Sequence, residues 1–345
     1  MSGSKAPTLR QLDKFAKAAR TPFGYLFLPQ PPREQLPIPH FRTLTDEPVS
    51  PSADLLETVH IMQRRQNWMR EHLIEQALEP LPFVRSAKVG EERKLIAREM
   101  RRTLGLEGGW AAKQPTWTGA LRNLQNRIED AGVIVVVNGV VGNNTHRKLD
   151  PTEFRGFVLV DEYTPLLFVN GADGKAAQMF TLAHELAHVW FGSSAAFDLR
   201  DLQPANNDTE RACNRVAAEF LVPEDELRSF WSSRKEKPDF QEIARHFKVS
   251  ELVAARRALD SGFITRDEFV QFYNDYQERE KHKPSKEGGD FYKNQNLRVG
   301  RRFAEAIFQA VREGRLLYHE AYHLTGLHGR AFEKYTSCLE FGRAA

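Results

Sequence analysis

The spacing of apolar residues predicts helices in the first part of the chain. An amphipathic pattern over Leu9–Ala19 predicts a short helix. Prolines between residues 29 and 39 then predict a stiff extended arm. Ser50 and Pro51 have the residue types that begin a helix, and the apolar positions behind them predict a long helix to about Ala77.

The period of the pattern changes in the middle of the chain. Helical patterns near Glu91–Leu104 and Trp117–Ala131 are followed by Val133–Val137, a run of β-branched residues. Phe154–Val160 and Leu166–Val169 are further strand candidates, and after them the helical period returns. Short strands between helices predict an α+β fold with a small sheet.

The last part of the chain is helical by its pattern. Asp239–Phe247, Ser250–Ser261 and Arg266–Tyr276 are helix candidates. The charged stretch Glu278–Glu287 reads as a linker, and a final helical segment begins at Val299.

Composition narrows the class of protein. The 345 residues are 41% hydrophobic and 28% charged, as in an ordinary globular protein. The 49 basic and 46 acidic residues give a net charge of +3, without the basic excess of a dedicated nucleic-acid binder. Two cysteines fit a reducing compartment, and no apolar run approaches the roughly 20 residues of a membrane helix. We therefore expect a cytoplasmic protein with no membrane segment and no signal peptide.

One helical segment carries a metal-binding pattern. His184, Glu185 and His188 form an HExxH motif with uncharged flanking residues. Residues four apart lie on one helix face, so His184 and His188 can direct two imidazole nitrogens at one metal ion. Glu185 lies beside that face, where it can take a proton from a water molecule whose acidity the metal raises.

A second helix offers a third ligand. Glu210 and Asn214 are four residues apart on one face of the segment that follows. Glu210 can be the third metal ligand, and Asn214 can hydrogen-bond an imidazole or a carboxylate. Glu219 lies about 180° from Glu210 on an ideal helix, so both cannot face the metal.

The chain holds a second HExxH pattern at His319, Glu320 and His323. No comparable acidic and amide pair follows it. We expect this second pattern to be the polar face of a terminal helix.

The first motif and the helix after it carry a family resemblance. The chain resembles the ImmA/IrrE family of metallopeptidases, whose members have HExxH followed by ExxxNxxAAxFLxP; the second part corresponds here to Glu210, Asn214, Ala217, Ala218, Phe220, Leu221 and Pro223. The resemblance implies a gluzincin-like fold, zinc (Zn2+) bound by His184, His188 and Glu210, and Glu185 as general base. Val216 stands where the family often has Phe, which changes packing only.

The resemblance also implies a domain organisation and a partner. Residues 7–43 are similar to the end of an Xre-type helix-turn-helix domain and its linker, so most of that domain of longer members is expected to be lacking. The expected regions are an N-terminal helix and Pro-rich arm (1–49), a zinc metallopeptidase domain (50–235), a helix-turn-helix-like helical region (236–280) and a C-terminal helical region (281–345). Relatives cleave a helix-turn-helix repressor or belong to toxin–antitoxin systems, so such a repressor or antitoxin is the expected substrate.

An alternative reading is a DNA-binding or protein-interaction regulator whose zinc site is structural or vestigial. It rests on residues 241–257, whose apolar positions resemble a helix-turn-helix. Such helix pairs often serve packing, so a supporting role is preferred, and DNA binding stays weakly supported.

Two further expectations concern substrate binding. Phe154–Val160 contains Gly156, where a neighbouring backbone can approach, so this segment is a candidate for the strand edge that holds an extended substrate. Tyr163 and His146, on segments near the strands, are candidates for polarising a scissile carbonyl.

Overall fold

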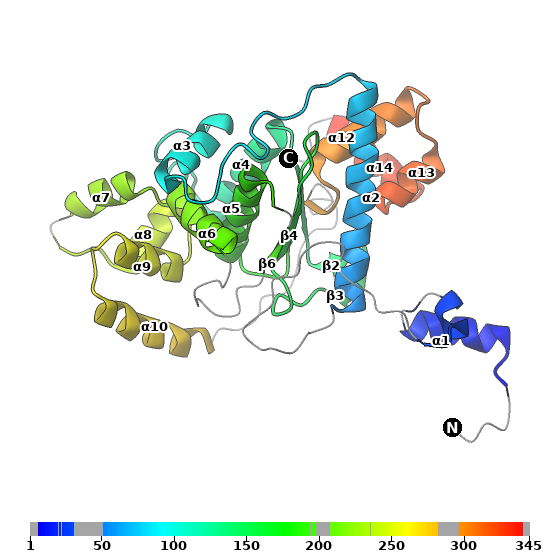
Figure 1. Cartoon of the computed structure of the whole chain (residues 1–345), viewed down its shortest axis with the longest axis horizontal. Coiled ribbons are helices and arrows are strands. Elements are labelled where there is room, and N and C mark those ends of the chain that lie inside the picture. The colour runs from blue at the N-terminus through cyan, green and yellow to red at the C-terminus, as the bar shows by residue number, and fades with distance from the viewer. Residues whose placement is uncertain are drawn as a thin grey trace.

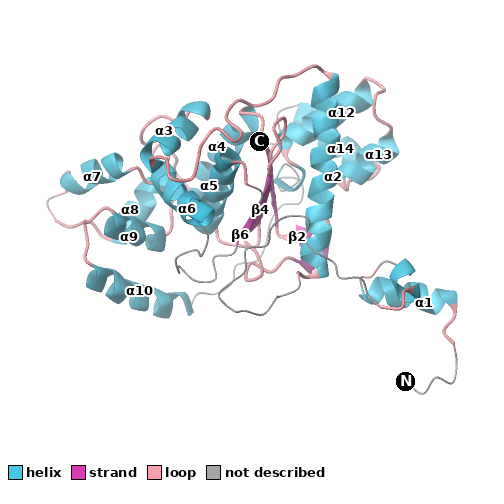
Figure 2. Cartoon of the chain, viewed as in Figure 1, coloured by secondary structure: helices cyan, strands magenta, loops and turns pink. Residues whose placement is uncertain are grey.

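A four-stranded mixed sheet lies between two sets of helices in the computed structural model (Figures 1 and 2). The structure describes residues 6–19, 21, 23–30, 51–193, 195–197, 208–234, 236–281 and 297–340. The strand order is β1-β5-β4-β6, with bounds Ile134–Asn138 for β1, Leu166–Asn170 for β5, Gly156–Leu159 for β4 and Ala195–Phe197 for β6. The predicted α+β class with a small sheet is confirmed.

The pairing of β4 overturns one expectation. β1 is parallel to β5, whereas β4 is antiparallel to both β5 and β6. Gly156, Phe157 and Val158 each have a partner on both sides, so the expectation that Phe154–Val160 is a substrate-binding edge is wrong. The error arose because β6 has only three residues, and a segment that short carries no readable alternation.

Successive residues of the strands face two different cores, as the two-residue period of a strand requires. On one face of the sheet, Val135, Val137, Val158 and other strand residues pack against helices α3–α6. On the other face, Val136 and Phe157 pack against α2 and α12–α14. We call these the metal-site face and the opposite face.

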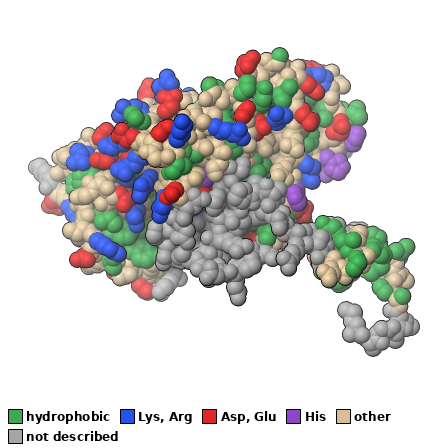
Figure 3. Space-filling view, in the orientation of Figure 1, with side chains coloured by type: hydrophobic (Ala, Val, Ile, Leu, Met, Phe, Trp, Pro, Cys, Tyr) green, Lys and Arg blue, Asp and Glu red, His purple; other side chains and the backbone are tan. Residues whose placement is uncertain are grey.

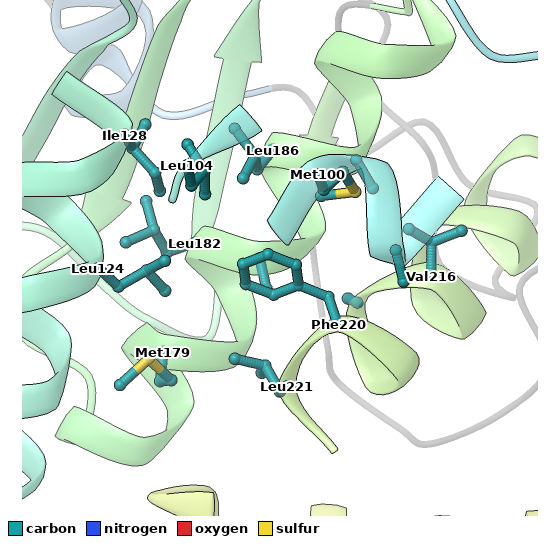
Figure 4. Packing of buried hydrophobic residues seen from close by; sticks show 14 of the residues in the cluster. Met100, Leu104, Leu124, Ile128, Met179, Leu182, Leu186, Val216, Phe220 and Leu221 are labelled. Atoms are coloured by element: carbon teal, nitrogen blue, oxygen red, sulfur yellow. The ribbon is translucent and has the colours of Figure 1, made fainter. Parts of the chain in front are cut away.

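The metal-site face is covered by helices from the middle of the chain. Helices α4 (Trp117–Asp130) and α5 (Lys175–Phe191) contact the sheet, α6 (Asp208–Leu221) packs on α5, and α3 (Arg93–Thr103) packs on α6. Their apolar side chains interdigitate (Figure 4). Beyond them follow α7 (Glu224–Ser232), α8 (Phe240–Phe247), α9 (Glu251–Asp260) and α10 (Arg266–Lys281).

The opposite face joins helices from the two ends of the described chain. They are α2 (Ala53–Glu75), α12 (Arg301–Arg312), α13 (Tyr318–Thr325) and α14 (Arg330–Glu340). The long helix α2 begins after Ser52 rather than at the predicted Ser50, because the Ser52 hydroxyl accepts a hydrogen bond from Leu55 N and itself donates to Glu153. The C-terminal helices thus share one core with α2 and the sheet.

The remaining elements are small. A two-stranded sheet pairs β2 (Val140–Val141) with β3 (Asn144–Lys148), and α1 (Leu9–Ala19) contacts the short helix η1 (Phe23–Phe27). Most of the predicted Pro-rich arm and part of the predicted linker at 278–287 lie outside the described residues. None of the helices in the described ranges is long and apolar enough to span a bilayer.

Candidate metal centre

Helix α5 carries the HExxH motif through the core. It follows Gly174 and ends at Gly192, whose φ of 74° is the left-handed conformation that favours glycine at a helix end. The helix is apolar on most of its surface, which is why it can lie buried between the sheet and α6. Its polar side chains His184, Glu185 and His188 are fully buried.

The three expected ligands converge. The Nε2 atoms of His184 and His188 are 3.1 Å apart, and each is 3.1 Å from one oxygen of the Glu210 carboxylate. Within the described residues, these three form the one group of His, Cys, Asp or Glu side chains that could hold a metal ion. The structure therefore brings together residues that lie 26 positions apart in the sequence.

Asn214 fixes the state of one imidazole. Its carbonyl oxygen lies 3.0 Å from His184 Nδ1. Because a carbonyl oxygen only accepts, the Nδ1 atom carries the proton and the Nε2 lone pair points at Glu210 and His188. Burial lowers the pKa of His184, which favours the neutral ring that a metal requires.

Glu185 lies beside the cluster rather than in it. Neither of its carboxylate oxygens has a hydrogen-bond partner in the described structure. Burial raises the pKa of Glu185 well above its usual value, and the charge of Glu210 adds to the rise. A Cβ atom on Gly156 would be 3.3 Å from Glu185 Oε1, so strand β4 forms a wall of the space that this carboxylate occupies.

The geometry fits a zinc ion. Tetrahedral zinc with bonds of about 2.0–2.1 Å places its ligand atoms about 3.3 Å apart, close to the three separations of 3.1 Å. Two neutral imidazoles and one carboxylate are the ligand set of many catalytic zinc sites. His184, His188 and Glu210 would hold the ion through Nε2, Nε2 and the carboxylate.

The other sequence candidates lie elsewhere. Glu219 is buried in an ion pair with Arg257, away from the cluster as expected. Tyr163 packs with the core of the opposite face and lies under Arg70, and His146 is exposed on β3.

The second HExxH pattern lies on the surface. His319, Glu320 and His323 are exposed residues of α13. Glu320 accepts a hydrogen bond from Leu317 N and so caps its own helix. The described residues around this pattern supply no third ligand.

The sequence did not single out Thr181, and it indicated the wrong neighbour for Gly156. Thr181 is fully buried one turn before Glu185, and a Cβ on Gly156 would meet its methyl group at 2.6 Å. The i, i+4 spacing of Thr181 and Glu185 was the available signal for the first. For Gly156, the sequence suggested a close approach, but the neighbour is helix α5 rather than a substrate backbone.

The fold and the buried cluster define a metallopeptidase-type domain, and comparison with known families agrees. Residues 129–259, from the end of α4 to α9, match the peptidase M78 family model, described as an IrrE N-terminal-like domain. This match supports the ImmA/IrrE resemblance that the sequence motifs indicate. That family of metallopeptidases implies a peptidase that uses a metal ion.

The comparisons extend to one more region. Residues 299–337, which cover α12–α13 and most of α14, match a domain of unknown function, DUF8813. No curated protein matches the chain.

Proposed function

We propose that this protein is a zinc-dependent endopeptidase. The observation that carries the proposal is the convergence of His184 Nε2, His188 Nε2 and the Glu210 carboxylate beside Glu185, whose carboxylate has no hydrogen-bond partner among the described residues. A structural zinc site has four protein ligands and no need of a fifth polar group. Three ligands with an adjacent buried carboxylate favour a catalytic site.

Each residue then has a separate task. Zinc would supply Lewis acidity that polarises the scissile carbonyl and lowers the pKa of water. Glu185 accepts the proton of the attacking water and later gives it to the leaving amine. Asn214 keeps the proton of His184 on Nδ1, so that Nε2 stays available as a ligand.

The proposed substrate is a helix-turn-helix repressor or antitoxin encoded nearby, cleaved in the cytoplasm to control transcription. This part rests on the family resemblance, since the cluster itself says nothing about sequence preference. Extended substrates are most readily held by an exposed strand edge. Strand β6 has β4 as its neighbour on one side of the described sheet, which makes β6 the better candidate for that edge.

The test compares the two HExxH patterns. We expect purified protein to bind about one zinc per chain and to cleave the product of a neighbouring regulator gene, with cleavage stopped by a chelator. Glu185→Gln should retain zinc and lose cleavage, whereas His188→Ala should lose both. His323→Ala, on the exposed second pattern, is the matched control and should change neither. Full cleavage by Glu185→Gln would refute the mechanism.

A second candidate function is a DNA-binding or protein-interaction regulator. Helices α8 and α9 pack on each other across a short turn: Asp239 and Ser250 cap their N-termini, and Lys248 adopts the left-handed conformation in the turn, with a φ of 56°. The observation in its favour is therefore the shape of this pair.

The surroundings of α9 favour a packing role instead. Within α9 only Arg256 and Asp260 are exposed, and they form an ion pair with each other. Arg257 is buried, where it donates to Val222 O and pairs with Glu219. Acidic and basic side chains are also interspersed on the face shown in Figure 3. A gel shift on the neighbouring promoter tests this reading; salt-sensitive, sequence-specific binding without proteolysis would favour it.

A further inference from the structure

The N-terminal helix α1 has an apolar face that the described structure covers only in part. Its apolar residues fall within about 120° of the helix circumference and are Leu9, Leu12, Phe15, Ala16 and Ala19. The helix packs on η1, and Figure 1 shows these two short helices apart from both helical layers. Neither of the two cores that flank the sheet includes a residue of α1 or η1.

Exposed large apolar side chains are concentrated in this part of the chain. Five of them lie within residues 9–28: Leu9 (69% exposed), Phe15 (57%), Phe23 (39%), Phe27 (59%) and Leu28 (48%). The other seven among the described residues are spread over residues 74–318. We call the five residues the N-terminal apolar patch, and Figure 3 shows hydrophobic side chains gathered over α1. A concentrated apolar patch on a surface marks an interaction site.

The two helices are too short to be stable by themselves. Helix α1 has 11 residues and η1 has five. An isolated helix shorter than about 12–15 residues is marginal in water, and helices in proteins are stabilised mostly by packing of an apolar face. We therefore expect α1 to gain stability from a surface that covers the patch.

The charged residues of α1 narrow the choice of that surface. Arg10 and Lys14 are exposed, and their positions on the helix are roughly opposite the apolar face. The charged residue nearest to the apolar face is Asp13, about 40° from Leu9 around the helix. An acidic residue at this border is unfavourable next to anionic lipid or an acidic protein. Two copies of the patch, in contrast, can face each other without bringing Arg10 and Lys14 together.

The area of the patch suits a dimer of modest affinity. A large apolar side chain has about 200 Å² of accessible surface, so the exposed fractions leave roughly 500 Å² per chain. Two patches in contact would bury about 1,000 Å² in total, the size at which a specific interface becomes possible. Burial of aromatic side chains also contributes most of the binding energy in many interfaces.

We propose that the N-terminal apolar patch is a dimer interface, which packs against the same patch of a second copy of this chain about a two-fold axis. The second copy is the occupant that fits, because no other stretch of the described chain exposes as many large apolar side chains within 20 residues. The proposal is independent of the peptidase activity.

Sedimentation equilibrium of the full-length protein from about 1 to 200 µM tests the proposal. We expect a reversible monomer–dimer equilibrium with a dissociation constant in the micromolar range. Phe15→Gln should raise this constant about tenfold. Leu95→Gln is the matched control and should leave it unchanged, since Leu95 is also 57% exposed but lies on α3. A monomer over the whole range, or equal weakening in both variants, would overturn the proposal.

The melting temperature shows whether Phe15→Gln still folds. Because Phe15 lies outside both cores, the variant should unfold within about 2 °C of the wild type when both are monomeric at low concentration. If it does not, Leu9→Gln replaces it, with the same expected loss of dimer.

Lys14→Glu distinguishes a second copy from an anionic partner. The dimer should keep its dissociation constant within about twofold in this variant, and added salt should not weaken an apolar contact. Vesicles that contain phosphatidylserine are the probe for a membrane. A protein that stays monomeric and binds these vesicles, with binding weakened by Lys14→Glu or by salt, would show that α1 binds lipid and would overturn the proposal.

Discussion

The two faces of the sheet each bury an ionisable side chain, and they differ in how many hydrogen-bond partners they give it. On the opposite face, Arg65 of α2 donates from its guanidinium to the carbonyl oxygens of Arg298, Leu324 and Thr325 at 2.8–3.3 Å. On the metal-site face, neither oxygen of Glu185 has a partner in the described structure.

This difference separates a structural charge from a functional one. Burying an ion is unfavourable unless its hydrogen-bonding capacity is filled, and Arg65 meets that condition with backbone carbonyls from the C-terminal helices. Glu185 does not meet it within the part of the chain that the structure describes. Folding stability alone cannot explain such a residue, so the explanation has to include what the site binds.

The largest expected effect comes from removing the satisfied charge. Arg65→Met leaves several buried carbonyl oxygens without donors, so we expect the free energy of unfolding to fall by about 4 kcal/mol. Zinc bound per folded chain should stay unchanged, because Arg65 lies across the sheet from His184. Urea unfolding and metal analysis measure the two quantities.

The neighbouring residue supplies the control for that experiment. Arg64 is exposed on the same helix, so Arg64→Met should leave the unfolding midpoint nearly unchanged. A similar loss of stability in both variants would mean that the carbonyl contacts of Arg65 contribute little.

Glu129 lies on α4, where this helix meets the start of α12. It is an intermediate case between Arg65, which has several partners, and Glu185, which has none in the described structure. Its carboxylate accepts a hydrogen bond from Arg302 N at the start of α12 and lies near Arg301. Burial raises the pKa of Glu129 to about 7, and the charge of Arg301 only partly offsets the rise. These partners therefore stabilise the ionised Glu129 carboxylate less than water does.

The buried Glu129 carboxylate should make the protein less stable as pH rises through 7. Because the folded pKa lies above the unfolded value, the contribution of Glu129 to stability is fully present below about pH 4.5 and is lost as pH rises through 7. This loss should reach about 3 kcal/mol by pH 8. Glu129→Gln should flatten the stability curve between pH 5 and 8, while Glu79→Gln, at an exposed glutamate far along the chain from this contact, should not. Identical slopes would contradict the assignment.

The same contrast explains which features could be predicted from the sequence. The ligand set is local to two helices: the spacing of His184, His188, Glu210 and Asn214 within each helix sets which side chains share a face. Only the meeting of the two helices is non-local, and the resemblance implied it. The fold class followed from the change of period near Val133.

Features that depend on distant neighbours could not be predicted. An amphipathic pattern says which face of α12 is buried but not that α2, more than 200 residues earlier, covers it. The pairing of β6 with β4 was missed for the same reason. The number of partners around Arg65 and Glu185 is equally non-local, so the sequence alone could not separate the structural charge from the functional one.

Gly156→Ala should have the smallest of these effects on stability and the largest effect on the cleavage rate. A Cβ atom there would lie 2.6 Å from Thr181 Cγ2 and 2.7 Å from Phe168 O, closer than atoms in contact can approach. Since Phe168 O belongs to the sheet and Thr181 to α5, relief requires one of these elements to shift. We expect Gly156→Ala to lower the free energy of unfolding by about 2 kcal/mol.

The shift should affect cleavage more than folding. Moving α5 away from β4 displaces Glu185, and a displacement near 1 Å at a proton-transfer group can lower the rate about a hundredfold. His184 and His188 move together on the same helix, so zinc should still bind. Gly24→Ala is the control and should change neither stability nor rate, because an added Cβ at Gly24 meets no atom within 4 Å. A Gly156→Ala protein that cleaves at the wild-type rate would show that the position of Glu185 does not depend on β4. The difference between the two faces would then concern stability alone and not catalysis.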